Sequence, residues 1–93
     1  MRKYELFEPV VLQDELAEPL IAKGTFGVVM ELIPPDGLAV EFFGSDGRTI
    51  DVALLSQAHV RPATKVEQKK ARLAGEKAAE RAIAAITENA QRR

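Results

Sequence analysis

Along the first part of the chain, short apolar runs alternate with turn sequences, whereas the last part is a run of helix-forming residues. Between Lys23 and Pro62 the apolar runs are rich in β-branched and aromatic residues, which is typical of strands. The turn sequences are PPDG at residues 34–37 and GSDG at residues 44–47. Because Asp-Gly tolerates the positive φ angles of a tight turn, the second sequence predicts a β-hairpin. The pattern as a whole predicts a small β-barrel.

Five strands are expected, and they run over residues 6–12, 25–33, 38–43, 49–54 and 59–61. In the third strand the apolar residues at even-numbered positions are expected to point into the core, because side chains of a strand alternate between its two faces. In the fourth strand Ile50, Val52 and Leu54 alternate with Thr49, Asp51 and Ala53. The prediction for that strand is a buried face that carries the three apolar residues and a wetter opposite face.

A helix is expected from Thr64 onward, because residues 64–67 read as a capping box. In this arrangement the Thr64 hydroxyl accepts from the N–H of Glu67, and the Glu67 carboxylate accepts from the N–H of Thr64. The segment up to about residue 90 contains strong helix formers and is interrupted only by Gly75, which costs roughly 1 kcal/mol relative to alanine. The chain therefore divides into a barrel domain, residues 1–62, and a helical extension, residues 63–93.

Length and charge refine this division. A chain of 93 residues has room for one small domain and an appendage. The formal net charge of -1 hides an asymmetry: residues 1–63 hold five Lys or Arg and ten Asp or Glu, whereas residues 64–93 hold eight and four. The expected barrel is thus acidic and the expected helix basic, which is one signature of an interaction tail.

The residue inventory argues against catalysis. The chain has no cysteine and a single histidine, which excludes disulfides and thiolate chemistry and leaves only carboxylates for a metal. Neither a Gly-rich phosphate loop nor a nucleophile paired with a base is present, so we expect no enzyme activity, no cofactor, no metal and no small-molecule substrate. No apolar run approaches the roughly 18 residues of a membrane span, and the first residues lack a signal-peptide pattern. We expect a cytoplasmic protein with no membrane partner.

Three segments resemble a family of short bacterial proteins described only as a domain of unknown function: KGTFGVVMEL, LAVEFFGSDGRTIDVALL and the closing VRP. The resemblance extends over residues 6–62. It implies an SH3-like barrel akin to the KOW domains of ribosomal and transcription factors, which share a strand of the form Gly-x-x-Gly-x-Val, as in Gly24, Gly27 and Val29. It implies no catalytic residues, and the helix from Thr64 departs from the family pattern. The expected fold is therefore mainly β, a five-stranded SH3-like barrel followed by a C-terminal α-helix.

Nucleic-acid binding is disfavoured by this composition. It requires a basic surface and aromatic stacking platforms, whereas the expected barrel is acidic and the chain has no tryptophan. Only the basic helix would attract a phosphate backbone. One alternative function is therefore an accessory subunit on nucleic acid or on a larger enzyme, with the C-terminal helix as its contact.

Protein binding is the favoured function. The helix would dock on another protein or on a second copy of the chain. The acidic residues would suit the neutralising member of an antitoxin-like or immunity-like pair, or a regulatory subunit. A third interpretation is a helix that only covers an open edge of the barrel. The candidate partner-binding residues are Asp14, Glu15 and Glu18 in an acidic loop over residues 13–22, Glu41 and Phe43 on the outer face of the third strand, and Leu73, Ile83 and Ile86 on the helix.

Overall fold

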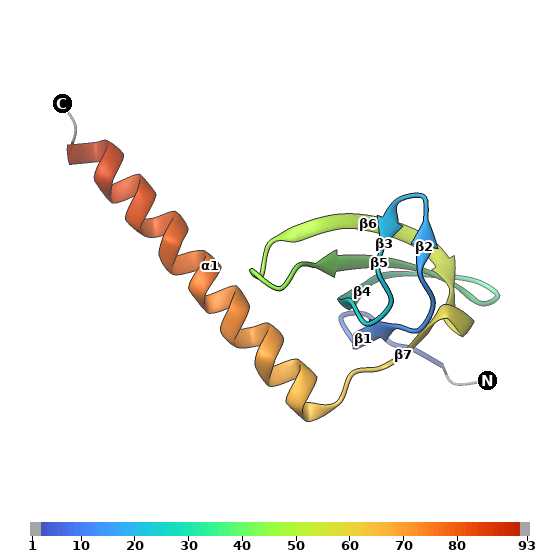
Figure 1. Cartoon of the computed structure of the whole chain (residues 1–93). Coiled ribbons are helices and arrows are strands. Elements are labelled where there is room, and N and C mark those ends of the chain that lie inside the picture. The colour runs from blue at the N-terminus through green and yellow to red at the C-terminus, as the bar shows by residue number, and fades with distance from the viewer. Residues whose placement is uncertain (1–2, 92–93) are drawn as a thin grey trace.

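The computed structural model describes residues 3–91. Its elements are β1 (Pro9–Leu12), β2 (Leu16–Ala17), β3 (Leu20–Ile21), β4 (Phe26–Ile33), β5 (Gly37–Phe43), β6 (Thr49–Ser56), the 3₁₀ turn η1 (Gln57–His59), β7 (Val60–Pro62) and the helix α1 (Lys65–Gln91). Figure 1 shows a curved sheet with the long helix standing beside it. The chain is therefore mainly β with one C-terminal helix, as the sequence pattern predicts.

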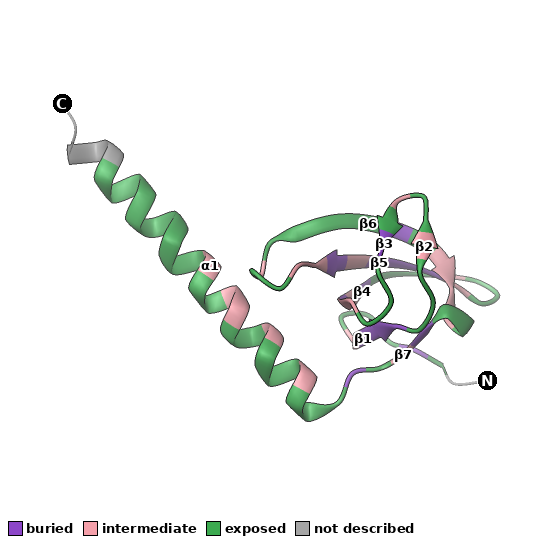
Figure 2. Cartoon of the chain, in the orientation of Figure 1, coloured by how far each residue is buried: buried purple, intermediate pink, exposed green. Residues whose placement is uncertain are grey.

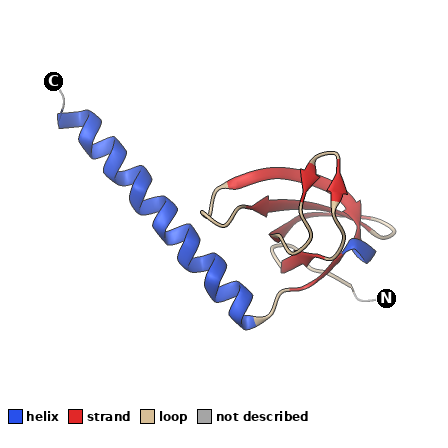
Figure 3. Cartoon of the chain, in the orientation of Figure 1, coloured by secondary structure: helices blue, strands red, loops and turns tan. Residues whose placement is uncertain are grey.

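The sheet is antiparallel and open. Its five strands follow the order β6-β5-β4-β1-β7, and β2 and β3 form a separate hairpin. Within residues 3–91 the two edge strands, β6 and β7, do not pair with each other. The sheet is therefore not closed, and the predicted barrel is not confirmed. Figure 3 shows the curved sheet, with the short strands β2 and β3 in front of it in this view.

Most of the predicted strand positions are confirmed to within one or two residues, which is the ordinary uncertainty of a strand boundary. The first strand is shorter than predicted and begins at Pro9, since Phe7 has a φ of 65° that breaks an extended backbone. The acidic segment 13–22, predicted as a loop, contains the β2–β3 hairpin.

The core lies on the inner face of the sheet. Leu38, Val40 and Phe42 point into it as predicted, and Phe42 is fully buried. Val10 of β1 and Ile21 of β3 pack in the same cluster. Figure 2 shows that the buried residues gather in the strands and the chain leading to α1, whereas the helix itself is half-buried or exposed. The sheet therefore folds around its own apolar core without the helix.

The predicted buried face of the fourth strand is wrong. Ile50, Val52 and Leu54 of β6 are exposed on the outer face, with 48%, 50% and 75% of their surfaces accessible. Ala53 is buried in their place. The smallest apolar side chain of the strand thus fills the core, and three larger ones face solvent.

A β-bulge at Ile50 explains this reversal. Next to the turn, Phe43 pairs with Thr49, but the following pair is Phe42 with Asp51, so Ile50 is an extra residue on β6. Because side chains alternate with period two, a shift of one residue turns every later side chain to the opposite face. Without the bulge, the apolar residues of β6 would lie opposite the core residues of β5, as the alternation predicts.

The helix begins as the sequence predicts. The N–H of Glu67 donates to Thr64 Oγ1 at 3.1 Å, and the N–H of Thr64 donates to Glu67 Oε1 at 2.8 Å. From Ala79 to Glu88 every helix residue is exposed, and the molecule measures 55 Å along its longest axis against 27 and 22 Å across. The first half of α1 therefore stands beside the sheet, and the second half extends beyond it (Figure 1). Among the residues described, no helix has the length and apolarity needed to cross a membrane.

Candidate functional site

A solvent-open cleft of about 960 Å³ separates α1 from the outer face of the sheet. Its floor contains Val11 of β1, Phe26 and Val28 of β4 and Phe43 of β5. The register places Val11 opposite Phe26, and Phe26 opposite Phe43, so three neighbouring strands contribute to one surface. The rings of Phe26 and Phe43 have centroids 6.5 Å apart and planes tilted by 44°, a favourable aromatic arrangement. The floor is thus a second apolar surface, separate from the core.

The helix side of the cleft is built from small residues. Ala71, Ala74 and Gly75 line it, and Ala78 is half-buried one turn further on. A face of alanine and glycine has no long side chains to reach the floor. Since nothing from the helix fills this space, the cleft stays open along the first half of α1.

One fixed contact holds α1 beside the sheet at its start. Arg61 of β7 donates to Glu67 through two hydrogen bonds, Nη1 to Oε1 and Nη2 to Oε2, each 2.8 Å long. Such a bidentate pair fixes orientation as well as distance. These hydrogen bonds, helped by the backbone N–H of Thr64, lower the pKa of Glu67 to about 2. The same hydrogen bond raises the pKa of Arg61.

A second fixed contact lies about two helical turns further on. Gly47, at the tip of the β5–β6 hairpin, lies against the helix backbone: a Cβ placed on it would come within 2.7 Å of Gly75 N and would collide with the carbonyl of Ala74. Figure 1 shows the hairpin tip reaching α1 at this place. Two contacts therefore hold the first half of α1 beside the sheet, the Arg61–Glu67 pair and the hairpin tip.

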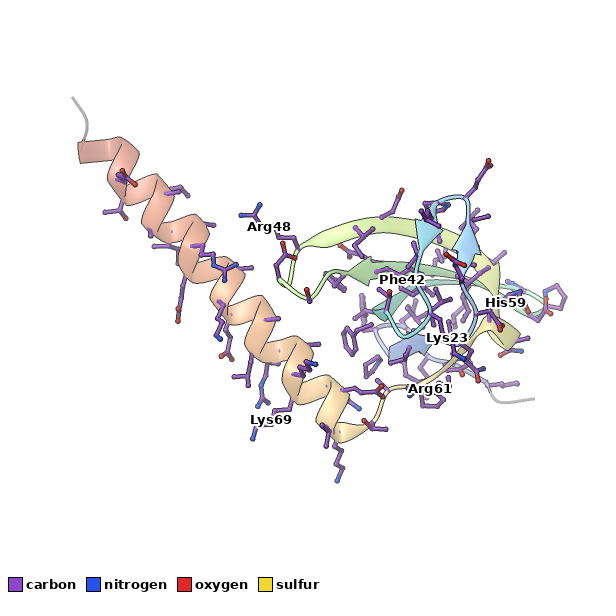
Figure 4. All side chains as sticks on the ribbon, viewed as in Figure 1. Lys23, Phe42, Arg48, His59, Arg61 and Lys69 are labelled. Carbon is purple, nitrogen blue, oxygen red and sulfur yellow. The ribbon has the colours of Figure 1, made fainter. Side chains whose placement is uncertain are left out.

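Cationic side chains surround the cleft. The cleft is lined by Lys23 from the loop before β4 and by four residues of α1: Lys65, Lys69, Lys70 and Arg72. Figure 4 shows the Lys69 side chain on the side of α1 that is turned away from the sheet, so its charge lies at the outer margin. Among the described residues Glu67 is the only acid that lines the cleft, and Arg61 compensates its charge. The cleft thus combines an apolar floor with a positive rim.

Of the predicted partner-binding residues, the structure brings only Phe43 into the cleft. Glu41 lies on the same outer face of β5, as predicted, but its Oε2 accepts a hydrogen bond of 2.6 Å from Thr49 Oγ1, and it does not line the cleft. The outward orientation predicted for these two residues is confirmed. Their role in binding stays a prediction.

The acidic residues lie elsewhere. Asp14, Glu15 and Glu18 are exposed in and beside the β2–β3 hairpin, and none of them lines the cleft. Asp14 Oδ2 lies 3.3 Å from Nδ1 of His59 in η1, an ion pair when the imidazole is protonated. This contact ties the hairpin to the turn before β7.

The predicted helix stripe of Leu73, Ile83 and Ile86 is exposed and does not contribute to the cleft. At 3.6 residues per turn, Ile83 and Ile86 lie about 80° and about 140° around the helix axis from Leu73. The three side chains are therefore spread over more than one face of α1, and the face turned toward the sheet carries Ala71, Ala74 and Gly75.

Sequence reasoning missed Phe26, Val28 and the Arg61–Glu67 pair. A signal for the first two was present: in the run from Phe26 to Met30 both alternating positions are apolar, apart from Gly27. A strand with two apolar faces has two surfaces to cover. The core covers one of them, and the other is the floor of the cleft.

Comparison with known proteins supplies no family for this chain: no family model, no curated protein and no solved structure matches it. The resemblance to the bacterial family of unknown function is thus neither supported nor refuted. Across residues 3–91, no group of three or more histidines and carboxylates is placed to hold a metal ion. Function has to be inferred from the geometry of the cleft itself.

Acidification is expected to weaken the anchoring of α1. Because folding lowers the pKa of Glu67 from 4.5 to about 2, its contribution to stability is present above pH 4.5 and is lost as the pH falls toward 2. At pH 5 the free energy of unfolding of wild type is expected to be higher than that of Glu67→Gln by about 1 kcal/mol. This value is small because the Arg61–Glu67 pair is partly exposed and solvent screens its charges. Urea denaturation at several pH values measures this difference.

The matched control is Glu76→Gln, on an exposed position of the same helix. Wild type and this variant are expected to lose stability in parallel with falling pH. The prediction is contradicted if wild type and Glu67→Gln differ in free energy of unfolding by the same amount at pH 5 and at pH 2. That result would show that the carboxylate charge of Glu67 contributes nothing to stability.

Proposed function

We propose that the protein is a non-catalytic protein-binding module whose cleft binds an apolar segment of another protein flanked by carboxylates. The observation that carries this proposal is the apolar floor of the cleft, open to solvent and surrounded by Lys and Arg side chains. Burying apolar surface on such a floor yields roughly 25 cal/mol per Å² of free energy. The cationic rim adds selectivity for acidic segments and raises the association rate.

The shape of the cleft supports an elongated occupant. Its walls are a strand layer and a helix, which two contacts, at Glu67 and at Gly47, hold side by side. A helix or an extended segment of the partner fits between such walls more readily than a globular surface does. The alanine face of α1 leaves the necessary space without any rearrangement of the sheet.

The SH3-like class of the sheet belongs to this proposal. Its support is a five-stranded antiparallel sheet in which the first and last strands, β1 and β7, lie side by side. A neutralising role of the antitoxin or immunity kind, or a regulatory one, also stays a prediction. Its support is the exposure of Asp14, Glu15 and Glu18 on the β2–β3 hairpin.

The alternative is an accessory role on nucleic acid through the basic helix. Its cations do not share one face: Lys69 borders the cleft with Lys70 and Arg72, but its side chain points away from the sheet (Figure 4). Two phenylalanines in the cleft floor could stack a base, but binding of that kind depends steeply on salt. An oligonucleotide competitor in the binding experiment therefore separates the two functions.

The test is selection of peptides from a random phage-displayed library on the full-length protein. Selected peptides are expected to combine apolar residues with Asp or Glu. Their affinity, measured by calorimetry, is expected to fall about tenfold or more in Phe43→Ser, which loses apolar contact in the cleft, and to fall in Lys70→Glu, which reverses a rim charge. Circular dichroism confirms that both variants keep the fold.

The matched control is Leu73→Ser, on a part of α1 that does not line the cleft. Peptide binding is expected to survive this change. The proposal that the cleft is the binding site is overturned if the peptides bind Phe43→Ser and Lys70→Glu as tightly as wild type but fail to bind Leu73→Ser. That result would favour docking through Leu73, Ile83 and Ile86. Displacement of the peptides by single-stranded DNA at physiological salt would favour the nucleic-acid function.

A further inference from the structure

The edge strand β6 carries a second exposed surface, distinct from the cleft. It is eight residues long, and within residues 3–91 it pairs only with β5, so one side of its backbone has no described strand beside it. Val52 and Leu54 are 50% and 75% exposed on the outer face beside this free edge. Isolated exposed apolar residues are common, but an apolar pair on a long edge strand is a template for another strand.

The hydrogen bonds between β5 and β6 show which residues of β6 direct their backbone groups toward the free edge. Gln57 N–H donates to Asp36 O at 2.9 Å and continues the β5–β6 register, in which Gly37 faces Ser56. Bonded and non-bonded pairs alternate in an antiparallel ladder, so residues 51, 53 and 55 bond to β5. Val52 and Leu54 therefore direct their N–H and C=O groups toward the free edge.

The contact made by Val52 agrees with this phase. Its N–H donates to Asp51 Oδ1 at 2.7 Å, and not to a carbonyl of β5. Natural edges are usually protected by lysine, proline, inward charges or bulges. Here the strand contains no lysine and no proline, and its bulge lies at one end, at Ile50. The side chain of Asp51 is the single charge along the strand and covers only one backbone group.

We propose that β6 pairs antiparallel with β6 of a second copy of this chain, about a two-fold axis at Ala53, and so joins the two sheets into one. This register pairs backbone groups that both point to the free edge. It sets Val52 opposite Leu54 of the second copy, and Leu54 opposite Val52 of the second copy, with about four inter-strand hydrogen bonds between them. The bond from Val52 N–H to Asp51 is replaced by one across the interface.

Self-complementarity argues for a second copy as the occupant. A two-fold interface requires the same strand to suit itself, and here the exposed Val52 and Leu54 of one copy meet Leu54 and Val52 of the other. The only charge, Asp51, lies opposite Leu55 of the second copy, so no like charges face each other across the axis. The strand offers no lysine or arginine by which a foreign strand would be selected. The bulge at Ile50 has turned the apolar residues outward, and pairing covers them.

This interface does not depend on the cleft. Ile50 lies at the margin of the cleft, whereas Val52 and Leu54 do not line it. A variant of β6 can therefore separate the dimer from peptide binding, and failure of one proposal leaves the other intact.

The first test is the mass in solution of the full chain, by light scattering after size exclusion at about 10 µM and about 200 µM, since dimers depend on concentration. We expect twice the chain mass of 10.2 kDa at the higher concentration. Leu54→Lys is expected to yield the monomer mass, because a lysine on the edge blocks strand pairing. The exposure of Leu54 lets the monomer keep its fold, which circular dichroism checks. The control Leu73→Lys, also an exposed apolar residue, is expected to stay dimeric.

The second test identifies the register. Ala53→Cys introduces the only cysteine of the chain at the two-fold axis, where two Cβ atoms of a non-bonded pair come close enough for a disulfide. Mild oxidation is expected to link this variant into dimers faster than Leu73→Cys, although residue 53 is buried and residue 73 is exposed. A monomer at both concentrations, or a dimer that persists in Leu54→Lys, overturns the proposal.

Discussion

Phe42→Ala is expected to unfold a large part of the protein at room temperature. Phe42 is fully buried in the hydrophobic core, where the inner face of β5 meets Val10 and Val29. Truncation of a buried phenylalanine to alanine lowers the free energy of unfolding by about 3–5 kcal/mol, because transfer free energy is lost and a cavity is left. A domain of this size has a stability of only about 3–9 kcal/mol. The loss therefore amounts to about a third or more of the total, and at the lower end of this range the variant is largely unfolded at room temperature.

Urea denaturation followed by circular dichroism measures the loss. Phe7→Ala is the matched control, because it makes the same chemical change at a side chain that is 67% exposed. We expect it to change the free energy of unfolding by less than about 1 kcal/mol. If both substitutions lower stability equally, Phe42 is not at the centre of a packed core.

Local signals in the sequence predicted the elements of this fold. The capping box at Thr64 marks the start of α1 to within a residue, because its two hydrogen bonds need only residues three positions apart. Alternation located the core face of β5 for the same reason. Each of these signals is complete within one short segment, so no knowledge of the rest of the chain is needed.

The buried face of β6 could not be predicted in this way. The alternation of Ile50, Val52 and Leu54 is regular, and a strand paired without a bulge would bury them. A single extra residue at the turn end reverses the outcome, and its presence is determined by how β5 and β6 meet, not by either sequence alone. The error is informative, since it identifies three apolar side chains that the fold leaves without a partner.

The cleft was beyond prediction for a different reason. Its floor comes from β1, β4 and β5 and its wall from the small residues of α1, and the contacts at Glu67 and Gly47 hold the helix beside the strands. The position of the helix is determined by two contacts: the Arg61–Glu67 pair, six residues apart in the sequence, and the approach of Gly47 to the backbone of Ala74 and Gly75, which belong to a distant segment. Sequence reasoning assigned Phe43 to an outward face, but it looked for the function of α1 in its isoleucines and leucine, and the structure uses the alanine face instead.

Gly47→Ala is expected to detach α1 from the hairpin tip. Gly47 has a φ of 81°, and a Cβ there would collide with the carbonyl of Ala74 and approach Gly75 N to 2.7 Å. The obstructing atoms belong to the helix backbone, which cannot rotate away as a side chain can. We therefore expect a loss of about 2–4 kcal/mol, the sum of left-handed backbone strain and a displaced helix. Hydrogen exchange of the amides around residue 75 is expected to accelerate as well.

Gly24→Ala separates the two contributions. Gly24 has a φ of 90°, similar to that of Gly47, but a Cβ there meets nothing within 4 Å. This control carries the backbone strain alone, expected at about 1–2 kcal/mol, and leaves the amides of α1 unchanged. The difference between the two variants measures the contact between hairpin and helix. Equal losses, with unchanged exchange in α1, would show that the hairpin tip does not hold the helix, and that the Arg61–Glu67 pair alone determines the width of the cleft.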